Sequence, residues 1–386
     1  PIDAPPVPLP MPHQRFLLPA AAVAAFAGLT VASPADAVAL AARLIPVLTF
    51  AAGMSAVVNL AARVRMFEWL VSALERGTSS REAVFAGFLA LTIVSTVFFS
   101  LDTTAIMLTP LAVQLASRFR LPQPAVALSV VWIANLASMP LPVSNLTNLL
   151  ALGGGAFSTN HDYIRAAAAP AAAAIAVAVA AAYSARLIYR AATPAPNHAP
   201  TAVARPTPAL IVLGATVAAL LSPVPYWLTG SLAAVAMWFA VGTNGRKAGA
   251  ASLIPWHALL LAAALSAAAA LALHVDAVAA AVGLLDGAHP GAIAAAGALL
   301  ANGINNLPAF LALEPAAGGQ DGVMALLIGV NAGPLVTPWA SLATLLWADQ
   351  LKRAGAAVPW RHFILWGLVL APVAVTAATA ALLAAG

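Results

Sequence analysis

The chain has 386 residues, of which 62% are hydrophobic and 8% are charged, and its mean hydropathy is +0.94. A soluble domain carries roughly 25% charged residues, so this composition excludes an ordinary soluble fold and predicts a polytopic membrane protein. The net charge of +5 comes from basic residues at the ends of apolar runs rather than from a continuous patch. That placement excludes nucleic acid as a partner.

Helices are the expected spanning structure, because apolar stretches of about 18 residues or more recur and lipid offers backbone groups no hydrogen-bond partners. The fold class is therefore predicted to be all-α. The chain contains no cysteine, which excludes disulfides, thiolate metal sites and a cysteine nucleophile. Histidines such as His257, His274 and His362 lie near predicted span ends, where interfacial positions are expected. No metal and no cofactor is predicted.

In chain order, residues 1–15 are rich in proline and are expected to form a solvated cytoplasmic tail. The first structural repeat is predicted to cover residues 16–190. Two of its long apolar segments, 81–117 and 124–152, are interrupted by polar clusters. We interpret 81–117 as a re-entrant helical hairpin and 124–152 as a broken transmembrane helix. The remaining elements are continuous spans at 16–33, 37–62 and 164–186 and an interfacial helix at 66–76.

Residues 191–225 are predicted to be a linker followed by a connecting helix at 207–224, which inverts the half that follows. The second repeat, 226–386, then has the same order of elements. Its hairpin is predicted at 290–314 and its broken helix at 322–351. The remaining elements are continuous spans at 226–243, 250–275 and 360–384 and an interfacial helix at 276–287.

The repeat is carried by two segments of equal length. Residues 135–150 and 331–346 align without gaps, with Asn135 opposite Asn331 and Pro142 opposite Pro338. Inverted repeats with broken helices are typical of secondary transporters, whose substrate site lies at the repeat interface near the middle of the membrane. The alternative is that the proline, glycine and serine positions only kink ordinary helices.

The charges indicate an orientation if both interrupted segments are hairpins. Basic residues at helix ends, among them Arg63, Arg118 and Lys352, then gather on one side of the bilayer. By the positive-inside rule that side is cytoplasmic, which predicts a multi-pass protein of the cell inner (cytoplasmic) membrane. The run 16–33 also fits a signal peptide, but this charge distribution favours a retained span. The opposite side holds Asp36, Asp162, Asp276, Asp286, Glu314 and Asp321.

Asp102, in the first hairpin, is the one carboxylate that this topology places near the membrane centre. A charge there costs roughly 2.5–3.5 kcal/mol, whereas a helix-terminus dipole returns only about 0.3–1 kcal/mol. We therefore expect Asp102 to spend part of a transport cycle protonated and to act as the proton-coupling residue. The alternative is that Asp102 caps the half-helix that begins at Thr103 or Thr104.

Broken helices leave amides and carbonyls without partners, which a membrane tolerates only where they face a cavity or a ligand. The polar side chains expected to form a substrate site there are Thr103, Thr104, Ser144, Asn145, Thr147, Asn148, Asn305, Asn306, Thr337, Ser341 and Thr344. The asparagines among them could equally satisfy broken backbone. Residues expected to shape the broken helices are Asn135, Pro142, Asn331, Gly333, Pro334 and Pro338. Asp349 and Glu314 lie near the two membrane faces, where solvation is expected.

These clusters resemble the arsenite permeases (arsenical pump membrane proteins) of the ion transporter superfamily. The similar segments are D-T-T-A-I-M-L-T-P at 102–110, S-M-P-L-P-V-S-N-L-T-N at 138–148, N-N-L-P at 305–308 and I-G-V-N-A-G-P-L-V-T-P-W-A-S-L-A-T-L-L-W at 328–347. The resemblance implies two inverted repeats, each with a hairpin and a broken helix. It also implies efflux of arsenite and antimonite across the lipid bilayer in exchange for protons. A homodimer and an ATPase subunit are partners that it leaves open.

The implied chemistry is consistent with the residues. Arsenous acid is mostly a neutral trihydroxy species at neutral pH, so a pocket of hydroxyls and amides can bind it through hydrogen bonds. An alternative is sodium- or proton-coupled transport of another oxyanion or a dicarboxylate, although Asp102 suits a proton better and would repel an anion. Neutral silicic or boric acid is a further alternative. An intramembrane enzyme is disfavoured, because no nucleophile–base pair and no second mid-membrane acid are found.

Overall fold

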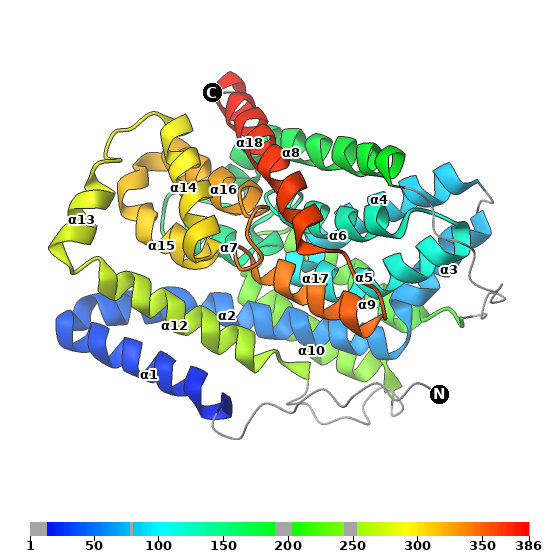
Figure 1. Ribbon diagram of the computed structural model, residues 1–386. Coiled ribbons are helices and arrows are strands. Elements are labelled where there is room, and N and C mark those ends of the chain that lie inside the picture. Colours follow the sequence, from blue (N-terminus) through cyan, green and yellow to red (C-terminus); the bar gives the residue numbers. More distant parts are fainter. Residues whose placement is uncertain (1–13, 78–79, 190–202, 243–252, 386) are drawn as a thin grey trace.

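The computed structural model describes residues 14–77, 80–189, 203–242 and 253–385, and the regular elements within those ranges are helices (Figure 1). The first half contains α1 (Gln14–Ala32), α2 (Pro34–Arg63), α3 (Met66–Gly77), α4 (Arg81–Phe99), α5 (Leu101–Phe119), α6 (Gln123–Leu136), the short 3-10 helix η1 (Pro142–Ser144), α7 (Leu146–Gly153) and α8 (Asn160–Ile188). The second half contains α9 (Thr207–Leu220), α10 (Tyr226–Ala240), α12 (Trp256–Ala272), α13 (Asp276–Gly283), α14 (Pro290–Ile304), α15 (Asn306–Ala317), α16 (Gly319–Ala332), α17 (Leu342–Arg353) and α18 (Trp360–Ala385). The predicted all-α class is confirmed. Most of the predicted tail lies outside the described residues, as do the first residues of the linker.

Helices α2, α4, α8 and α18 are each long and apolar enough to cross a membrane, and α12 with α13 forms such a segment with a 90° bend. The predicted spans 207–224 and 226–243 are shorter in the structure, because α9 has 14 residues and α10 has 15. At 1.5 Å per residue, each covers about 21–23 Å of a hydrocarbon core about 30 Å thick. Pro223 and Pro225 follow the end of α9 and account for its early end, because they lack the backbone N–H that a helix needs.

The two interrupted segments each form a helix, a one-residue break and a second helix. The breaks are Ser100 between α4 and α5 and Asn305 between α14 and α15, with φ angles of 86° and 119°. Such angles are rare for residues other than glycine. Each break residue caps the helix that follows: Ser100 Oγ accepts from the Thr103 amide at 3.4 Å, and Asn305 Oδ1 accepts from the Leu307 amide at 3.2 Å.

The two predicted broken helices are interrupted where the prolines and glycine stand. Between α6 and α7 the chain leaves the helix, and Pro142 opens η1. Between α16 and α17, Gly333 ends the first half-helix and Pro334 and Pro338 follow within the break. Each proline removes a backbone N–H donor and so weakens a helix through the break.

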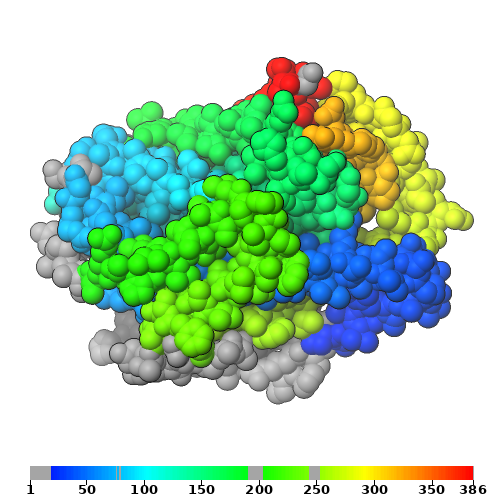
Figure 2. Space-filling model, turned by 180° about the vertical axis from the view of Figure 1, so that it is seen from behind, coloured from blue at the N-terminus to red at the C-terminus, as the bar shows by residue number. Residues whose placement is uncertain are grey.

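The helices pack as two groups. The α2 group consists of α1, α2, α9, α10 and α12, and the hairpin group consists of α4 to α8 and α14 to α18. The groups meet where α12 packs against α15 and α2 packs against α7. In Figure 1 the helices α1, α2, α10 and α12 lie together below the hairpin group. Figure 2 shows the opposite face, where the green α9–α10 segment lies against the blue N-terminal helices.

Within the α2 group, α2 packs against α10 and α1 packs against α12. In the predicted repeats 16–190 and 226–386, the first helix of each repeat thus pairs with the second helix of the other. Two-fold-related repeats produce such reciprocal pairs, and the inverted relation itself remains a prediction.

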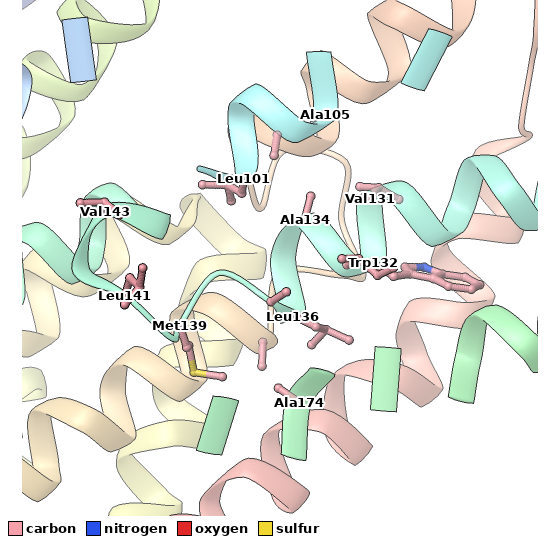
Figure 3. Close-up of a cluster of buried hydrophobic side chains, with 14 of the residues drawn as sticks. Leu101, Ala105, Val131, Trp132, Ala134, Leu136, Met139, Leu141, Val143 and Ala174 are labelled. Carbon is pink, nitrogen blue, oxygen red and sulfur yellow. The ribbon is translucent and has the colours of Figure 1, made fainter. Parts of the chain in front are cut away.

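The core of the hairpin group is built around α6, most of whose side chains are buried. Figure 3 shows Ala105 of α5 and Ala134 of α6 pointing toward one another, with Ala174 of α8 on the other side of α6. Small residues at these positions let the helix backbones approach closely, which is how helices pack in membranes. The half-helices are therefore held in place by dense packing.

Candidate functional site

A cavity of about 120 Å³ lies against the tip of the first hairpin. The α2 group contributes α2 and the start of α12 to its wall, and the hairpin group contributes α5, α17 and residues around η1. Its polar lining consists of Ser55, Asn59, Ser100, Asp102 and Thr103, and the remaining lining residues are apolar. Among the described residues of this lining, Asp102 carries the sole charge. The cavity can therefore offer a carboxylate and a few hydroxyl and amide groups to a small solute.

Asp102 stands in the first turn of α5 and faces this cavity. Its Oδ1 atom is buried and has no hydrogen-bond partner among the described residues. The capping role weighed for Asp102 falls instead to Ser100, because α5 already begins at Leu101. Oδ1 is therefore a buried acceptor that a proton can occupy, with the helix N-terminus as its nearby source of positive charge.

The two threonines that follow have different surroundings. Thr103 lines the cavity beside Asp102. Thr104 lies inside the hairpin, where its hydroxyl donates to Ser95 Oγ at 2.9 Å and lies 3.1 Å from the Thr96 hydroxyl. In this conformation Thr104 holds α4 against α5.

Four predicted residues meet where the two broken helices cross. The Asn145 amide and the Thr147 hydroxyl donate to Asn331 Oδ1, at 2.9 and 2.8 Å, and the Asn331 amide donates to Asn148 Oδ1 at 2.7 Å. All four side chains are buried. The network joins the halves of the chain and satisfies these polar groups. It gives them a structural role here, and their contact with substrate stays a prediction.

The other predicted residues near the first break hold backbone. The Ser144 hydroxyl donates to the Val97 carbonyl at 2.7 Å and so ties the break to the first hairpin. The Asn135 amide donates to the Val131 carbonyl at 2.9 Å, which leaves Asn135 Oδ1 without a partner among the described residues. The buried hydroxyls of Ser341 and Thr344, at the start of α17, are also unpaired within the described part of the chain.

The tip of the second hairpin is fixed to the second break, mainly through a residue outside the predicted set, Asn302. Its amide donates to the Gly333 carbonyl at 2.8 Å, and its Oδ1 accepts from the amides of Val336 and Thr337, both at 3.1 Å. The Thr337 hydroxyl donates to the Asn302 carbonyl at 2.7 Å. Asn302 lies three residues before the break residue Asn305. That spacing places two residues on the same face of a helix, so it could have indicated that Asn302 acts at the tip together with Asn305.

The predicted Asn305 and Asn306 also contact the second break. The side-chain amide of Asn305 donates to the Trp339 carbonyl at 2.9 Å, and the backbone amide of Asn306 donates to the Ala340 carbonyl at 2.9 Å. Neither residue lines the cavity at the first hairpin. Both hairpins are thus bonded to a break, the first through Val97 and the second through its tip, and the first tip also borders the cavity.

The expectation that Glu314 is solvated is wrong. Glu314 lies on α15 and accepts two hydrogen bonds from Arg43 of α2, at 2.7 and 2.5 Å, and the two side chains are only 18% (Arg43) and 16% (Glu314) exposed. Arg43 Nε also donates to the Leu150 carbonyl in the last turn of α7, at 2.8 Å. The reason for the difference is that a charged group within an apolar helix requires a partner.

Comparison with known proteins places the chain among membrane transporters. The arsenical pump membrane protein of Escherichia coli is 36% identical to it over 81 residues, which is 19% of this chain and 19% of that protein. The alignment thus spans about one fifth of that relative. The family model for citrate transporters matches residues 14–323. That match covers most of the described helices, and the chain belongs to the citrate transporter family of the ion transporter superfamily.

Proposed function

We propose that this protein exports arsenite and antimonite from the cytoplasm, as neutral trihydroxy acids, in exchange for protons. Its family makes it a multi-pass membrane protein and a secondary transporter rather than an enzyme. The substrate and the coupling ion are the proposal, with Asp102 as the proton carrier. The partial similarity to an arsenical pump membrane protein supports the same substrate.

The observation that carries the proposal is the charge of the cavity. Asp102 is its charged group, and no arginine, lysine or histidine is found among the described residues that line it. Two like charges 4 Å apart repel by about 4 kcal/mol at an effective dielectric constant of 20. A citrate anion would meet that repulsion whenever Asp102 is deprotonated, and no cation among the described lining residues would offset the charge of citrate in either state. A neutral trihydroxy acid can instead donate hydrogen bonds to the carboxylate.

Exchange of substrate for protons follows if the proton and the substrate compete for Asp102. An unpaired charge near the membrane centre costs roughly 2.5–3.5 kcal/mol, so the empty site favours the protonated carboxyl group. A deprotonated Asp102 accepts hydrogen bonds from substrate hydroxyls, and Thr103 and Asn59 line the same cavity. Because the protonated group loses acceptor capacity, binding of a proton from outside favours release of the substrate.

The direct experiment is an arsenite-sensitivity test in a host that lacks its own efflux system. Cells that express the chain should survive higher arsenite and antimonite concentrations than cells that express the Asp102→Asn variant at equal protein level. In everted vesicles, arsenite uptake should require an imposed pH gradient. Equal sensitivity of the two strains, with no uptake into vesicles, would refute arsenite export.

Citrate is the second candidate, because the family model that matches the chain is that of citrate transporters. Uptake of labelled citrate into the same vesicles tests it. Citrate uptake without arsenite transport would reverse the assignment. Boric and silicic acid, which share the neutral hydroxy-acid chemistry, are tested as competitors of arsenite.

The basic helix ends support a position in the inner (cytoplasmic) membrane with those ends inside. A homodimer and an ATPase partner remain predictions. Pull-down of the tagged chain from detergent-solubilised membranes addresses both.

A further inference from the structure

We infer that the Arg43–Glu314 ion pair is a latch that closes the cavity toward the acidic ends of the helices and must open during transport. The inference rests on the chain being a transporter but not on arsenite as its substrate. Arg43 belongs to the α2 group and Glu314 to the hairpin group, so the pair joins the two bodies between which the cavity lies.

The pair and the cavity lie toward opposite ends of the helices. Arg43 stands in the first third of α2, near the end that carries Asp36, and Glu314 stands in the last turn of α15. The cavity walls instead include Ser55 and Asn59, in the half of α2 that ends at Arg63. They also include Leu342 and Leu346 of α17, which ends at Lys352 and Arg353. The cavity therefore extends from the hairpin tip toward the basic ends, and the ion pair lies beyond it.

Arg43 holds two elements of the hairpin group at once. Its guanidinium donates to both oxygens of Glu314 on α15 and to the Leu150 carbonyl at the end of α7. Two parallel N–H···O bonds to one carboxylate are a strong and directional contact. Separation of α2 from α7 and α15 on this side thus requires all four of these hydrogen bonds, from one side chain to Glu314 and to the Leu150 carbonyl, to break together.

The surrounding backbone is shaped to admit the pair. Gly154 follows α7 directly, and a Cβ atom there would lie 2.6 Å from Glu314 Oε1 and 2.7 Å from the Arg43 guanidinium. Its φ of −80° would suit any residue, so space rather than backbone conformation requires glycine. The substitution Gly154→Ala therefore obstructs the latch without removing either charge.

The test is the accessibility of the cavity from each side of the membrane. Because the chain has no cysteine, the variant Ser55→Cys places a single thiol on the cavity wall. A membrane-impermeant thiol reagent should modify it from the basic side and leave it protected on the acidic side. Adding Glu314→Gln or Gly154→Ala should raise modification from the acidic side by about tenfold, the population change that corresponds to about 1.4 kcal/mol.

Two matched controls separate a latch from general loosening. Glu82→Gln breaks the Glu82–Arg186 pair, which joins α4 to α8 within the hairpin group. Gly214→Ala adds a methyl group where nothing lies within 4 Å. Both should leave acidic-side modification unchanged. Unchanged modification in folded Glu314→Gln and Gly154→Ala proteins would overturn the latch, and the readout is independent of any arsenite transport.

A cross-link provides the converse test. In Arg43→Cys/Glu314→Cys, a short bifunctional thiol reagent should join the α2 group to the hairpin group and prevent opening on the acidic side. Transport of labelled arsenite, or of labelled citrate if the chain carries citrate instead, should then fall at least about tenfold and recover when a cleavable linker is reduced. Each single-cysteine variant should be unaffected by the reagent. Transport that continues at full rate in the cross-linked protein would show that the two residues stay together and would refute the latch.

Discussion

Asn331 of the second broken helix donates to Asn148 of the first at 2.7 Å, inside a buried network that also includes Asn145 and Thr147. Residues almost half the chain length apart are thus bonded side chain to side chain at the crossing of the two broken helices. Both polar atoms of the Asn331 side chain take part in these hydrogen bonds. The directions of the bonds, as well as packing, therefore fix how the two broken helices cross.

Removing Asn331 should destabilise the protein. In Asn331→Leu, Asn145, Thr147 and Asn148 lose their partner, and each buried group left unpaired costs about 1–3 kcal/mol. We expect a clearly lower thermal unfolding midpoint in detergent, whereas Ser184→Ala, which removes an exposed hydroxyl bonded within its own helix, should have little effect. An unfolding midpoint equal to that of the unchanged chain would show that the network is not a structural element.

Asp102→Asn should abolish proton coupling without loss of stability. The substitution removes the titratable group while keeping its size, and it removes a carboxylate whose Oδ1 has no partner among the described residues. We expect no accumulation of arsenite driven by a pH gradient in everted vesicles and an unfolding midpoint that is unchanged or raised. Full gradient-driven uptake by this variant would eliminate Asp102 as the carrier.

Much of this architecture could be predicted from the sequence, because polar clusters within apolar runs are costly in lipid and therefore informative. The breaks at Ser100 and Asn305 lie in two such clusters. The Arg43–Glu314 ion pair could not be predicted from the sequence, since the two residues are 271 residues apart and no local pattern relates them. The role of Asn302 could not be predicted, because its partners are backbone groups of the second break, which only the tertiary fold brings near.

Thr103 and Thr104 should separate binding from stability. Thr103→Val removes a hydroxyl from the cavity wall, and we expect the apparent affinity for arsenite to fall about 2- to 12-fold, which corresponds to about 0.5–1.5 kcal/mol for one hydrogen bond. Thr104→Val should instead lower the unfolding midpoint, because that hydroxyl bonds Ser95 within the hairpin. Transport assays and thermal unfolding of both variants check this, and identical behaviour of the pair would count against the cavity as the binding site.

Asn302→Ala should loosen the second hairpin from the second break. The asparagine side chain links the tip to Gly333, Val336 and Thr337, and alanine leaves those groups without these bonds. We expect faster amide hydrogen exchange at 333–340 and a lower unfolding midpoint, with exchange around the first hairpin unchanged. Uniform exchange rates across both hairpins would show that the tip is held by packing alone.

The inverted relation of the two halves makes a prediction about Asn135 and Ser341. In the sequence alignment these residues correspond to Asn331 and Asn145, which are hydrogen-bonded. The indole N–H of Trp347 donates to the Ala127 carbonyl at 2.8 Å and fixes α17 alongside α6. Asn135 is about two turns beyond Ala127, and Ser341 is nearly two turns before Trp347, so antiparallel packing of α6 and α17 would bring them to the same level.

A double-mutant cycle on Asn135→Ala and Ser341→Ala measures whether they interact. If the halves are related by a two-fold axis, the two substitutions should be coupled by about 0.5–3 kcal/mol of unfolding free energy, as residues in contact are. Shortening both side chains should then cost less than the sum of the single changes. Additive costs within about 0.3–0.5 kcal/mol would place the two residues apart, and the second half would then not repeat the polar crossing of the first.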